Sequence, residues 1–178
     1  MSQAPFRVVV MGVSGCGKST LGRLLAARLS VPFVEGDDLH SAANVAKMAA
    51  GQPLTDEDRG GWLSALSQRL HQAVSQEQGL VVACSALKRN YRDLLRQGAA
   101  EVLFVHLQGS PEVLAQRLLQ RTGHYMPPTL LQSQLAILQP LQEDEAALTL
   151  DMQLPPEQQC HQVMQYLQTL CPSPLGAA

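Results

Sequence analysis

A short apolar run, a glycine-rich turn and an amphipathic segment follow one another near the start of the chain, and this succession constrains the fold more than any other feature. The run is FRVVVM (6–11), the turn is GVSGCGKST (12–20), and the segment is LGRLLAARL (21–29). A run that is apolar without alternation is typical of a strand buried on both faces of a parallel sheet. The leucines of the segment recur at helical spacing. The sequence therefore predicts a strand, a tight loop and a helix, in that order.

The same alternation of short apolar runs and helical patterns continues along the chain. One helix is expected from Asp56, as its N-cap, and another from the start signal Ser110-Pro111-Glu112. Such alternation predicts an α/β fold, in which a parallel sheet carries helices on both faces and ligands gather at the carboxyl ends of the strands. The expected strands are Phe6–Met11, Val31–Glu35, Leu80–Cys84, Val102–Leu107 and Leu148–Met152.

Length and composition favour one folded domain over residues 1–172, followed by a short tail, 173–178. The chain has 178 residues, 46% of them hydrophobic, and a formal net charge of −2, so its charge favours neither nucleic acid nor an anionic membrane as a partner. The first residues lack the pattern of a signal peptide and no apolar run is long enough to span a bilayer, so we expect a cytoplasmic protein. The histidines show no zinc-ligand spacing. Free thiols are expected at Cys16, Cys84, Cys160 and Cys171.

The glycine-rich turn matches the pattern G-x-x-x-x-G-K-[ST], after a strand and before a helix, which is the context that gives this pattern meaning. Glycines allow the backbone to wrap tightly and point its N–H groups inward, and the positive end of the next helix attracts phosphate. Lys18 is expected to reach the β- and γ-phosphates of ATP, and the Ser19 hydroxyl to ligate Mg²⁺. The alternative is a turn without a ligand. The expected nucleotide-binding residues of the turn are Gly12, Val13, Ser14, Gly15, Cys16, Gly17, Lys18, Ser19 and Thr20.

Cys16 within this turn has two interpretations. A position at a helix N-terminus lowers the pKa of a thiol and makes it easier to oxidise. The other interpretation, which we favour, is a small side chain that only lines the loop.

Acidic residues follow the second expected strand. The segment FVEGDDLH places Glu35, Asp37, Asp38 and His40 just past its carboxyl end, opposite the phosphate-binding turn. A carboxylate there is able to orient an acceptor hydroxyl and take its proton, and another to hold Mg²⁺ through water. The alternative is a solvated turn, in which Asp38 or Ser41 only caps the next helix.

Basic residues in two later segments suggest an anionic, hydroxyl-rich acceptor. Lys88 and Arg92 are four residues apart and share a face if ACSALKRNYRDLLR is helical. Arg89 and Asp93 are interpreted instead as surface charges that pair locally. The expected contacts of the acceptor are Arg59, Ser85, Lys88 and Arg92.

The segment RLLQRTGHYMPP places Arg117 and Arg121 on one helix face, ahead of a hinge of Gly and Pro-Pro. Arginines beside a mobile loop suit a lid, expected over about 121–130, whose closure excludes water and stabilises the transferring charge. Arg117 is expected at the nucleotide and Arg121 at the transferring phosphoryl group. The alternative is that both are ordinary surface arginines.

Four segments together resemble the small P-loop gluconokinases, which are related to shikimate and adenylate kinases. They cover most of the chain in family order: MGVSGCGKST, EGDDLHSAANVAKMAAGQPLTDEDR, ACSALKRNYRDLLR and GHYMPPTLLQSQ. The resemblance implies transfer of the γ-phosphate of ATP to the 6-hydroxyl of D-gluconate. It also implies a three-layer α/β/α fold with a five-stranded parallel sheet, a helical substrate-binding insertion over about 37–78, a lid and, in many members, a homodimer.

The resemblance assigns roles residue by residue. It implies that Asp37 holds the acceptor hydroxyl and that Glu35 lies near the water shell of Mg²⁺. It implies that gluconate contacts are found among His40, Arg59, Lys88 and Gln134. The expected catalytic residues are then Lys18, Asp37 and Arg121. Asp37 orients the hydroxyl and accepts its proton, while Lys18, Mg²⁺ and Arg121 neutralise the γ-phosphoryl charge.

One departure from the family pattern affects the expected structure. Gly60-Gly61 stands where the family has a proline before the tryptophan, which predicts a looser hinge ahead of Trp62.

Two alternative functions stay open. The first is a kinase for another acceptor, such as shikimate, a nucleoside monophosphate or a different sugar acid. The second is a nucleotide-operated switch of the GTPase kind, because residues 58–61 read D-x-x-G. No apolar strand precedes that match, however, and the chain contains no N-K-x-D motif for guanine.

Overall fold

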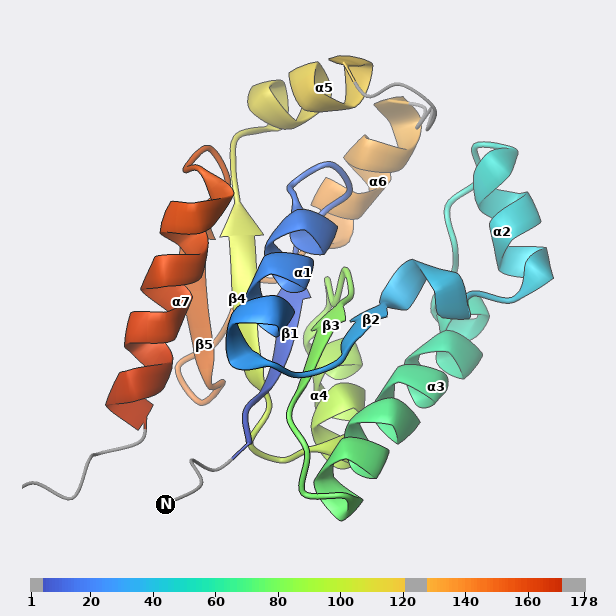
Figure 1. The fold of residues 1–178 in the computed structure, drawn as a ribbon. Helices are drawn as coiled ribbons and strands as arrows, with labels where there is room; N and C mark the ends of the chain where they lie inside the picture. The colour runs from blue at the N-terminus through green and yellow to red at the C-terminus, as the bar shows by residue number, and fades with distance from the viewer. Residues whose placement is uncertain (1–4, 121–127, 171–178) are drawn as a thin grey trace, which may run out of the picture.

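The computed structural model describes residues 5–120 and 128–170, and Figure 1 shows how they are arranged. Strands and helices alternate along the chain, as the sequence predicts. The strands are β1 (Arg7–Met11), β2 (Phe33–Glu35), β3 (Leu80–Ala83), β4 (Leu103–Gln108) and β5 (Ala147–Asp151). The helices are α1 (Lys18–Leu29), the 3-10 helix η1 (Gly36–Leu39), α2 (Ala42–Ala49), α3 (Asp56–Ser75), α4 (Arg89–Gly98), α5 (Pro111–Gln120), α6 (Pro128–Ile137) and α7 (Pro156–Leu170).

The strands form one parallel sheet in the order β2-β3-β1-β4-β5. β1 is central, and its Val9 lies between Val82 of β3 and Phe104 of β4. Because all the strands run the same way, the connections that leave β1, β2 and β3 meet at one edge of the sheet. The expected five-stranded parallel sheet is confirmed, with strand ends that differ from the prediction by one or two residues.

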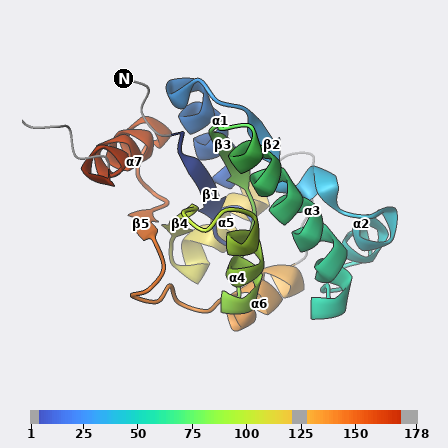
Figure 2. The ribbon, with the colours of Figure 1, turned by 90° about the horizontal axis from the view of Figure 1, so that it is seen from below.

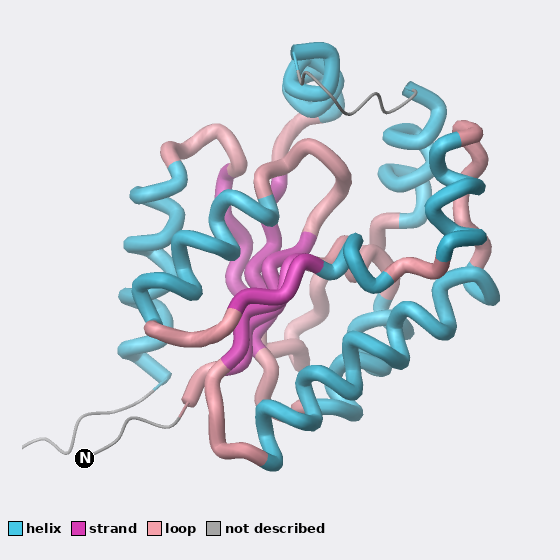
Figure 3. Tube along the Cα trace, turned by 45° about the vertical axis from the view of Figure 1, so that its right-hand side comes forward, coloured by secondary structure: helices cyan, strands magenta, loops and turns pink. Residues whose placement is uncertain are grey.

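Helices cover both faces of the sheet, so its side chains enter two separate hydrophobic clusters. Val8 and Val10 of β1 pack in the cluster that includes side chains of α1 and α7, whereas Val9 and Met11 pack in the one that includes α3 and α4. Figures 1 and 3 show the sheet between these two layers, and Figure 2 shows α7 and α3 on opposite sides. The three-layer α/β/α architecture is therefore confirmed. Within the described ranges no helix combines the length and the apolar character needed to cross a bilayer.

The start of α3 is fixed by a capping box that places the N-cap at Thr55 and not at Asp56. The Thr55 hydroxyl accepts a hydrogen bond from the Asp58 amide at 3.1 Å, and the Asp58 carboxylate accepts one from the Thr55 amide at 2.7 Å. These two bonds satisfy amides that a helix N-terminus otherwise leaves unpaired. Asp56 is thereby the first residue of the helix, with its side chain free for other contacts.

The looser hinge expected ahead of Trp62 is wrong. α3 runs without interruption through Gly60 and Gly61. Trp62 is 3% exposed, and its indole N–H donates to the carbonyl oxygen of Gly36 at 2.7 Å. The helical hydrogen bonds and this buried anchor outweigh the backbone freedom of the two glycines.

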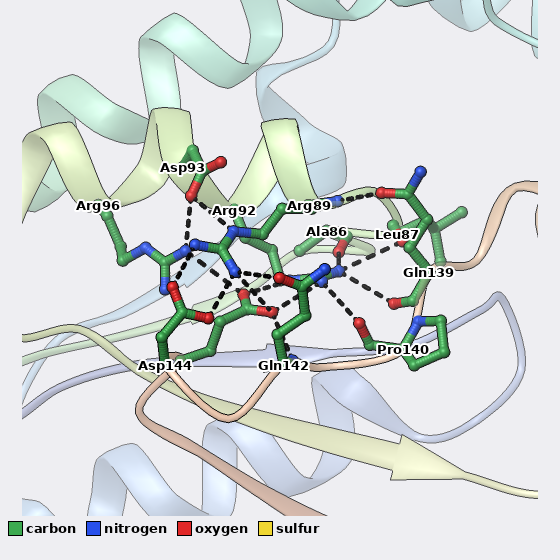
Figure 4. A network of polar contacts seen from close by, with 11 residues as sticks. Ala86, Leu87, Arg89, Arg92, Asp93, Arg96, Gln139, Pro140, Gln142 and Asp144 are labelled. Atoms are coloured by element: carbon green, nitrogen blue, oxygen red, sulfur yellow. Dashed lines mark hydrogen bonds and ion pairs between the residues drawn. The ribbon is translucent and has the colours of Figure 1, made fainter.

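Arg92 joins α4 to the connection between α6 and β5. Its side chain is fully buried, and its Nε and Nη2 donate to the carboxylate of Glu145 at 2.6 and 3.0 Å. The guanidinium also donates to four main-chain carbonyl oxygens, as Figure 4 shows, and these belong to Ala86, Leu87, Gln139 and Pro140. The expected convergence of Arg92 on an acceptor is therefore wrong. Arg92 lies on the inner face of α4, where Glu145 neutralises it.

The local pairing expected of Arg89 and Asp93 is confirmed. Nε of Arg89 lies 2.9 Å from the Asp93 carboxylate, and the same guanidinium forms two bonds of 2.7 Å with Asp144. Arg96 also contacts Asp93, at 2.6 Å. These outer pairs surround the buried pair of Arg92 and Glu145.

The buried pair gives the first prediction. Glu145→Gln is expected to lower the free energy of unfolding by about 3 kcal/mol, because the Arg92 guanidinium would stay buried without its counterion. Although burial acts to raise the pKa of Glu145, hydrogen bonding from Arg92 holds that pKa below its usual value, so the carboxylate is ionised at neutral pH. Urea denaturation at pH 7 measures the loss.

The matched control is the neighbouring carboxylate. The Asp144 side chain is 65% exposed, so Asp144→Asn is expected to cost much less than Glu145→Gln. Similar losses in the two variants would contradict a dominant role for the buried pair.

Candidate active site

The loop between β1 and α1 has a backbone that favours glycine at positions 12, 15 and 17, which all have a positive φ. Gly12 has a φ of 138°, and Gly17, the N-cap of α1, has a φ of 105°. A Cβ on Gly12 would lie 2.8 Å from both Sγ of Cys16 and the carbonyl oxygen of Leu107, which is too close. Gly17 offers no side chain to cap α1, so the first amides of this helix stay available to an anion.

A cavity of about 350 Å³ lies over this loop. Lys18 is one of its lining residues, and the Lys18 ammonium donates to the carbonyl oxygen of Val13 at 3.1 Å. Two other segments reach the cavity, η1 with Asp37 and α5 with Arg117 and Gln120. The structure thus brings Asp37 and Arg117 to the phosphate-binding loop, together with Gln120, which the sequence did not single out. The lining residues are Ser14, Gly15, Gly17, Lys18, Ser19, Thr20, Asp37, Arg117 and Gln120.

Arg117 is held beside the loop by the segment that follows β5. Its Nη2 donates to the carbonyl oxygen of Met152 at 2.8 Å. This contact directs a guanidinium towards the anion-binding end of α1. The second arginine expected here, Arg121, lies outside the described residues, as does most of the expected lid, 121–127.

The acidic segment after β2 forms η1, which packs tightly on the neighbouring strand. A Cβ on Gly36 would collide with the carbonyl oxygen of Ala83, so β2 and η1 approach β3 more closely there than another residue allows. This packing holds Asp37 at the cavity. The capping role considered for Asp38 or Ser41 falls to Ser41, whose hydroxyl accepts from the Asn44 amide at 3.1 Å.

Glu35 ends β2 and lies beside α1. Its carboxylate is 3.7 Å from the guanidinium of Arg23, which in turn lies over the ring of Phe33 at 4.6 Å. Asp37 is the carboxylate that lines the cavity with the Ser19 hydroxyl. A hydroxyl oxygen is a ligand that Mg²⁺ takes, together with phosphate oxygens and water, so Ser19 fits a nucleotide-bound magnesium ion, and Asp37 adds negative charge at the same cavity. Among residues 5–120 and 128–170, no group of three or more His, Cys, Asp and Glu side chains is placed to hold a metal.

His40 packs against the tryptophan that anchors η1. Its ring stacks on Trp62 with centroids 4.3 Å apart, and its Nδ1 lies 3.5 Å from the side-chain amide of Asn44. Burial lowers the pKa of His40, against an opposing effect of Asp37 and with a smaller contribution from Arg59. His40 is therefore neutral at neutral pH, and its ring is able to exchange hydrogen bonds with hydroxyl groups.

Two side chains donate to Asp56 at the start of α3, and Arg59 contacts one of them. The Lys88 ammonium donates to both carboxylate oxygens of Asp56, at 2.8 and 2.9 Å, and the Tyr91 hydroxyl donates to the same carboxylate. Buried Arg59 donates to the Tyr91 hydroxyl at 3.3 Å and to the carbonyl oxygen of Leu54 at 2.7 Å. The structure thus brings together the predicted acceptor residues Arg59 and Lys88.

The same contacts shift the pKa values of the cluster. Hydrogen bonding to Asp56 raises the pKa of Lys88, and hydrogen bonds from Lys88 and then Tyr91 lower the pKa of Asp56. Sequence reasoning considered Asp56 only as a cap and passed over Tyr91. The signal for Tyr91 in the sequence was its spacing from Lys88, which places both residues near the first turn of one helix.

Ser85 connects the loops that follow β1 and β3. Its carbonyl oxygen accepts a hydrogen bond from the Gly12 amide at 3.2 Å. The loop that carries Ser85 and Lys88 is therefore attached to the phosphate-binding loop by its main chain.

Gln134 of α6 contacts the phosphate-binding loop directly. Its side-chain carbonyl oxygen accepts a hydrogen bond from the Ser14 amide at 2.7 Å. The resemblance implied a gluconate contact at Gln134, and the structure places this side chain on the loop between β1 and α1.

The cysteines of the described residues are free thiols, as expected for Cys16, Cys84 and Cys160, whereas Cys171 lies outside those residues. Cys16 is 1% exposed and packs in the hydrophobic cluster on the α1 side of the sheet. This burial supports its interpretation as a small side chain that fills the loop. Burial raises the pKa of Cys84 to about 12, so this thiol stays protonated.

Comparison with known proteins agrees with this geometry. The family model described as shikimate kinase matches residues 14–168. A gluconokinase of Gluconobacter oxydans is 45% identical, over 94% of this chain and 94% of its own length. Among solved structures, a sugar kinase from Janibacter superposes with a TM-score of 0.88 at 45% identity, covering 92% of this chain and 95% of its own. A gluconokinase from Sinorhizobium meliloti superposes with a TM-score of 0.82 at 41% identity, covering 95% and 99%.

A phosphate-binding loop at the end of a central parallel strand, facing a carboxylate across one cavity, defines a P-loop kinase of the shikimate kinase family. Within this class, the identity to curated relatives over nearly the whole chain is decisive. The chain belongs to the gluconokinases.

A buried histidine beneath the loop gives a pH prediction. His106 of β4 is 7% exposed and lies beside Met11, the last residue of β1. Burial, and to a lesser degree the charge of Arg92, lowers the pKa of His106 to about 4. Between this value and about 6.5, the ordinary pKa of histidine, the unfolded chain binds a proton that the folded chain does not.

His106 should therefore contribute stability that is fully present above pH 6.5 and is lost as the pH falls towards 4. The expected loss is about 3 kcal/mol, which follows from about 1.4 kcal/mol for each pKa unit. Urea denaturation at several pH values measures it, with His106→Leu as the comparison. If both proteins lose stability equally over this range, His106 is not the group responsible.

Proposed function

We propose that this chain transfers the γ-phosphate of ATP to the 6-hydroxyl of D-gluconate, giving 6-phosphogluconate and ADP. The observation that carries the proposal is that Lys18, Ser19 and Asp37 line one cavity in a chain that is 45% identical to a gluconokinase. In this reaction the acceptor oxygen forms a bond to the γ-phosphorus, the bond to the bridging oxygen of ADP breaks, and the hydroxyl proton is released.

On the nucleotide side, main-chain amides and Lys18 hold the phosphates. Lys18 now donates to the Val13 carbonyl, a neutral partner that a phosphate oxygen replaces at little cost. Ser19 would hold Mg²⁺ with the nucleotide and water, and Glu35 would contact the ion through one of its waters. When bound, this ion neutralises charge on the β- and γ-phosphates. Arg117 would contact the nucleotide.

On the acceptor side, Asp37 orients the hydroxyl and accepts its proton. The proton moves late, because the transition state of phosphoryl transfer is loose and little charge develops early on the attacking oxygen. Positioning and electrostatic stabilisation then account for most of the rate increase. Arg121 in a closing lid would add positive charge at the transferring group.

The cluster around Asp56 supports an acceptor with a single carboxylate. Arg59 and Lys88 supply two positive charges and Asp56 one negative charge, which leaves one positive charge for the ligand. The Lys88 side chain is 23% exposed, so its ammonium is able to exchange or share its carboxylate partner. His40 and Ser85 would form hydrogen bonds with the hydroxyl groups of gluconate that lie between its carboxylate and its reacting end.

A GTPase-like switch receives no support from the D-x-x-G match. Residues 58–61 lie within α3, where Asp58 completes the capping box and bonds to Lys47 at 2.6 Å. Both contacts of Asp58 thus serve the local structure around α3.

We also propose that the protein is located in the cytoplasm and assembles as a homodimer. Light scattering of the purified protein tests the assembly.

The acceptor is tested with a panel. D-gluconate, shikimate, a nucleoside monophosphate and other sugar acids are supplied with ATP, and ADP release is measured, with GTP as an alternative donor. Gluconate with ATP is expected to give the highest kcat/KM by at least about tenfold, since several charged and hydroxyl contacts distinguish it. Failure of gluconate to exceed the other acceptors would overturn the assignment.

The role of Asp37 is tested against its neighbour. Asp37→Asn is expected to lower kcat by about two orders of magnitude or more while ADP still binds, because the variant keeps the size of the side chain and loses the proton acceptor. Asp38→Asn is the matched control, since Asp38 is exposed in the same turn of η1. Near-normal turnover of Asp37→Asn would rule out this role.

A further inference from the structure

α6 contacts both halves of the proposed site. Near its middle, Gln134 accepts the hydrogen bond from the Ser14 amide in the phosphate-binding loop. Just after its end, the Gln139 amide donates to the carbonyl oxygen of Leu87 at 2.8 Å, and the Gln139 side chain accepts from the Arg89 amide at 2.7 Å. The second pair of bonds lies at the start of α4, next to Lys88. One helix thus connects the nucleotide loop with the acceptor loop.

The end of α6 next to the acceptor loop is firmly held. Buried Arg92 donates to the carbonyl oxygens of Gln139 and Pro140 at 3.3 and 3.2 Å (Figure 4). Arg92 is in turn neutralised by Glu145. Leu130 and Leu131 near the start of α6 are 6% and 5% exposed, so the helix is also packed from within. Because α6 is held in place by these contacts, a side chain that it carries is able to position another segment.

The phosphate-binding loop needs such support because of its composition. Glycines at positions 12, 15 and 17 have positive φ values and allow many backbone conformations when the chain is free. Phosphate binding requires one conformation, with the amides directed to one point. A fixed acceptor for the Ser14 amide favours one of those conformations before a nucleotide binds. Less free energy is then spent on ordering the loop when the nucleotide binds.

We propose that Gln134 is a positioning residue for the nucleotide, which acts by fixing the Ser14 amide and with it the conformation of the phosphate-binding loop. The inference rests on the proposed kinase function. It assigns Gln134 to the ATP side of the reaction and makes α6 the element through which the acceptor loop supports the nucleotide loop. A direct contact between Gln134 and gluconate is the competing assignment.

The test replaces the Gln134 amide with an apolar group of similar length. Gln134→Met is expected to raise the KM for ATP and the dissociation constant of ADP by about three- to tenfold, the effect of losing one hydrogen bond. The KM for gluconate should stay within about twofold. Gln132→Met is the matched control, because Gln132 is an exposed glutamine of the same helix, and all its constants should be unchanged.

The outcomes separate the possible roles. A raised KM for gluconate with an unchanged KM for ATP would overturn the proposal in favour of the direct contact. A lower melting temperature with both constants unchanged would reduce Gln134 to a structural role and also overturn it. ADP affinity, measured by calorimetry without an acceptor, does not depend on gluconate being the substrate. Failure of the wild-type protein to phosphorylate gluconate is thus distinguishable from failure of this inference.

A second variant tests the connection through α6. Gln139→Met removes the side-chain bond to the Arg89 amide and should also raise the KM for ATP. If the two contacts act through the same helix, the double variant with Gln134→Met should be no worse than Gln134→Met alone. If the fold-increases in the KM for ATP of the two single variants multiply in the double variant, the two contacts act independently, and the connection through α6 is overturned.

Discussion

The position of β1 between β3 and β4 is the constraint on which the rest of the site depends. All three strands are parallel, so each delivers its following loop to the same edge of the sheet. The first residue after β1 is already joined to the loop after β3, through the bond from the Gly12 amide to the Ser85 carbonyl oxygen. The close approach of Gly36 to β3 adds the segment after β2. Nucleotide loop, acidic segment and basic loop are thereby placed together by the main chain before any side chain contributes.

Several cations at this edge that are buried or half-buried are each paired with a carboxylate. Arg92 has Glu145, Lys88 has Asp56, and Lys47 has Asp58. Lys18 differs, because the contact made by its ammonium is to a main-chain carbonyl oxygen. A carbonyl oxygen competes with phosphate far less than a carboxylate does. Contact with a main-chain carbonyl oxygen therefore leaves the charge of Lys18, like that of Arg117, available to an anionic ligand.

Features that depend on local pattern could be predicted from the sequence. The five strands follow from apolar runs without alternation, and the phosphate-binding loop follows from glycine spacing between a strand and a helix. The family resemblance also allowed the five-stranded sheet and the class of reaction to be predicted. Asp37 and Arg117 could be placed near the loop because both follow elements that end at the same edge.

Features that depend on contacts between distant residues could not be predicted. Arg92 shares helical spacing with Lys88, but its partner Glu145 is 53 positions away. Sequence spacing indicates which residues share a helix face, but it does not indicate whether that face is buried. The contact of Gln134 with Ser14 spans 120 positions for the same reason. Gly60 and Gly61 suggested a hinge, and packing of Trp62 overrode that local preference.

The chain has a single tryptophan, and it is placed beside the proposed acceptor site. Trp62 stacks on His40 and is bonded to Gly36, the residue before Asp37. All indole emission of the protein therefore comes from this one position, on the acceptor side of the cavity. The intrinsic fluorescence of the unlabelled enzyme should then report on occupancy of the proposed acceptor site, while the nucleotide is observed through its own absorbance. The molecule in this sense contains its own optical probe for following the order in which its two substrates bind.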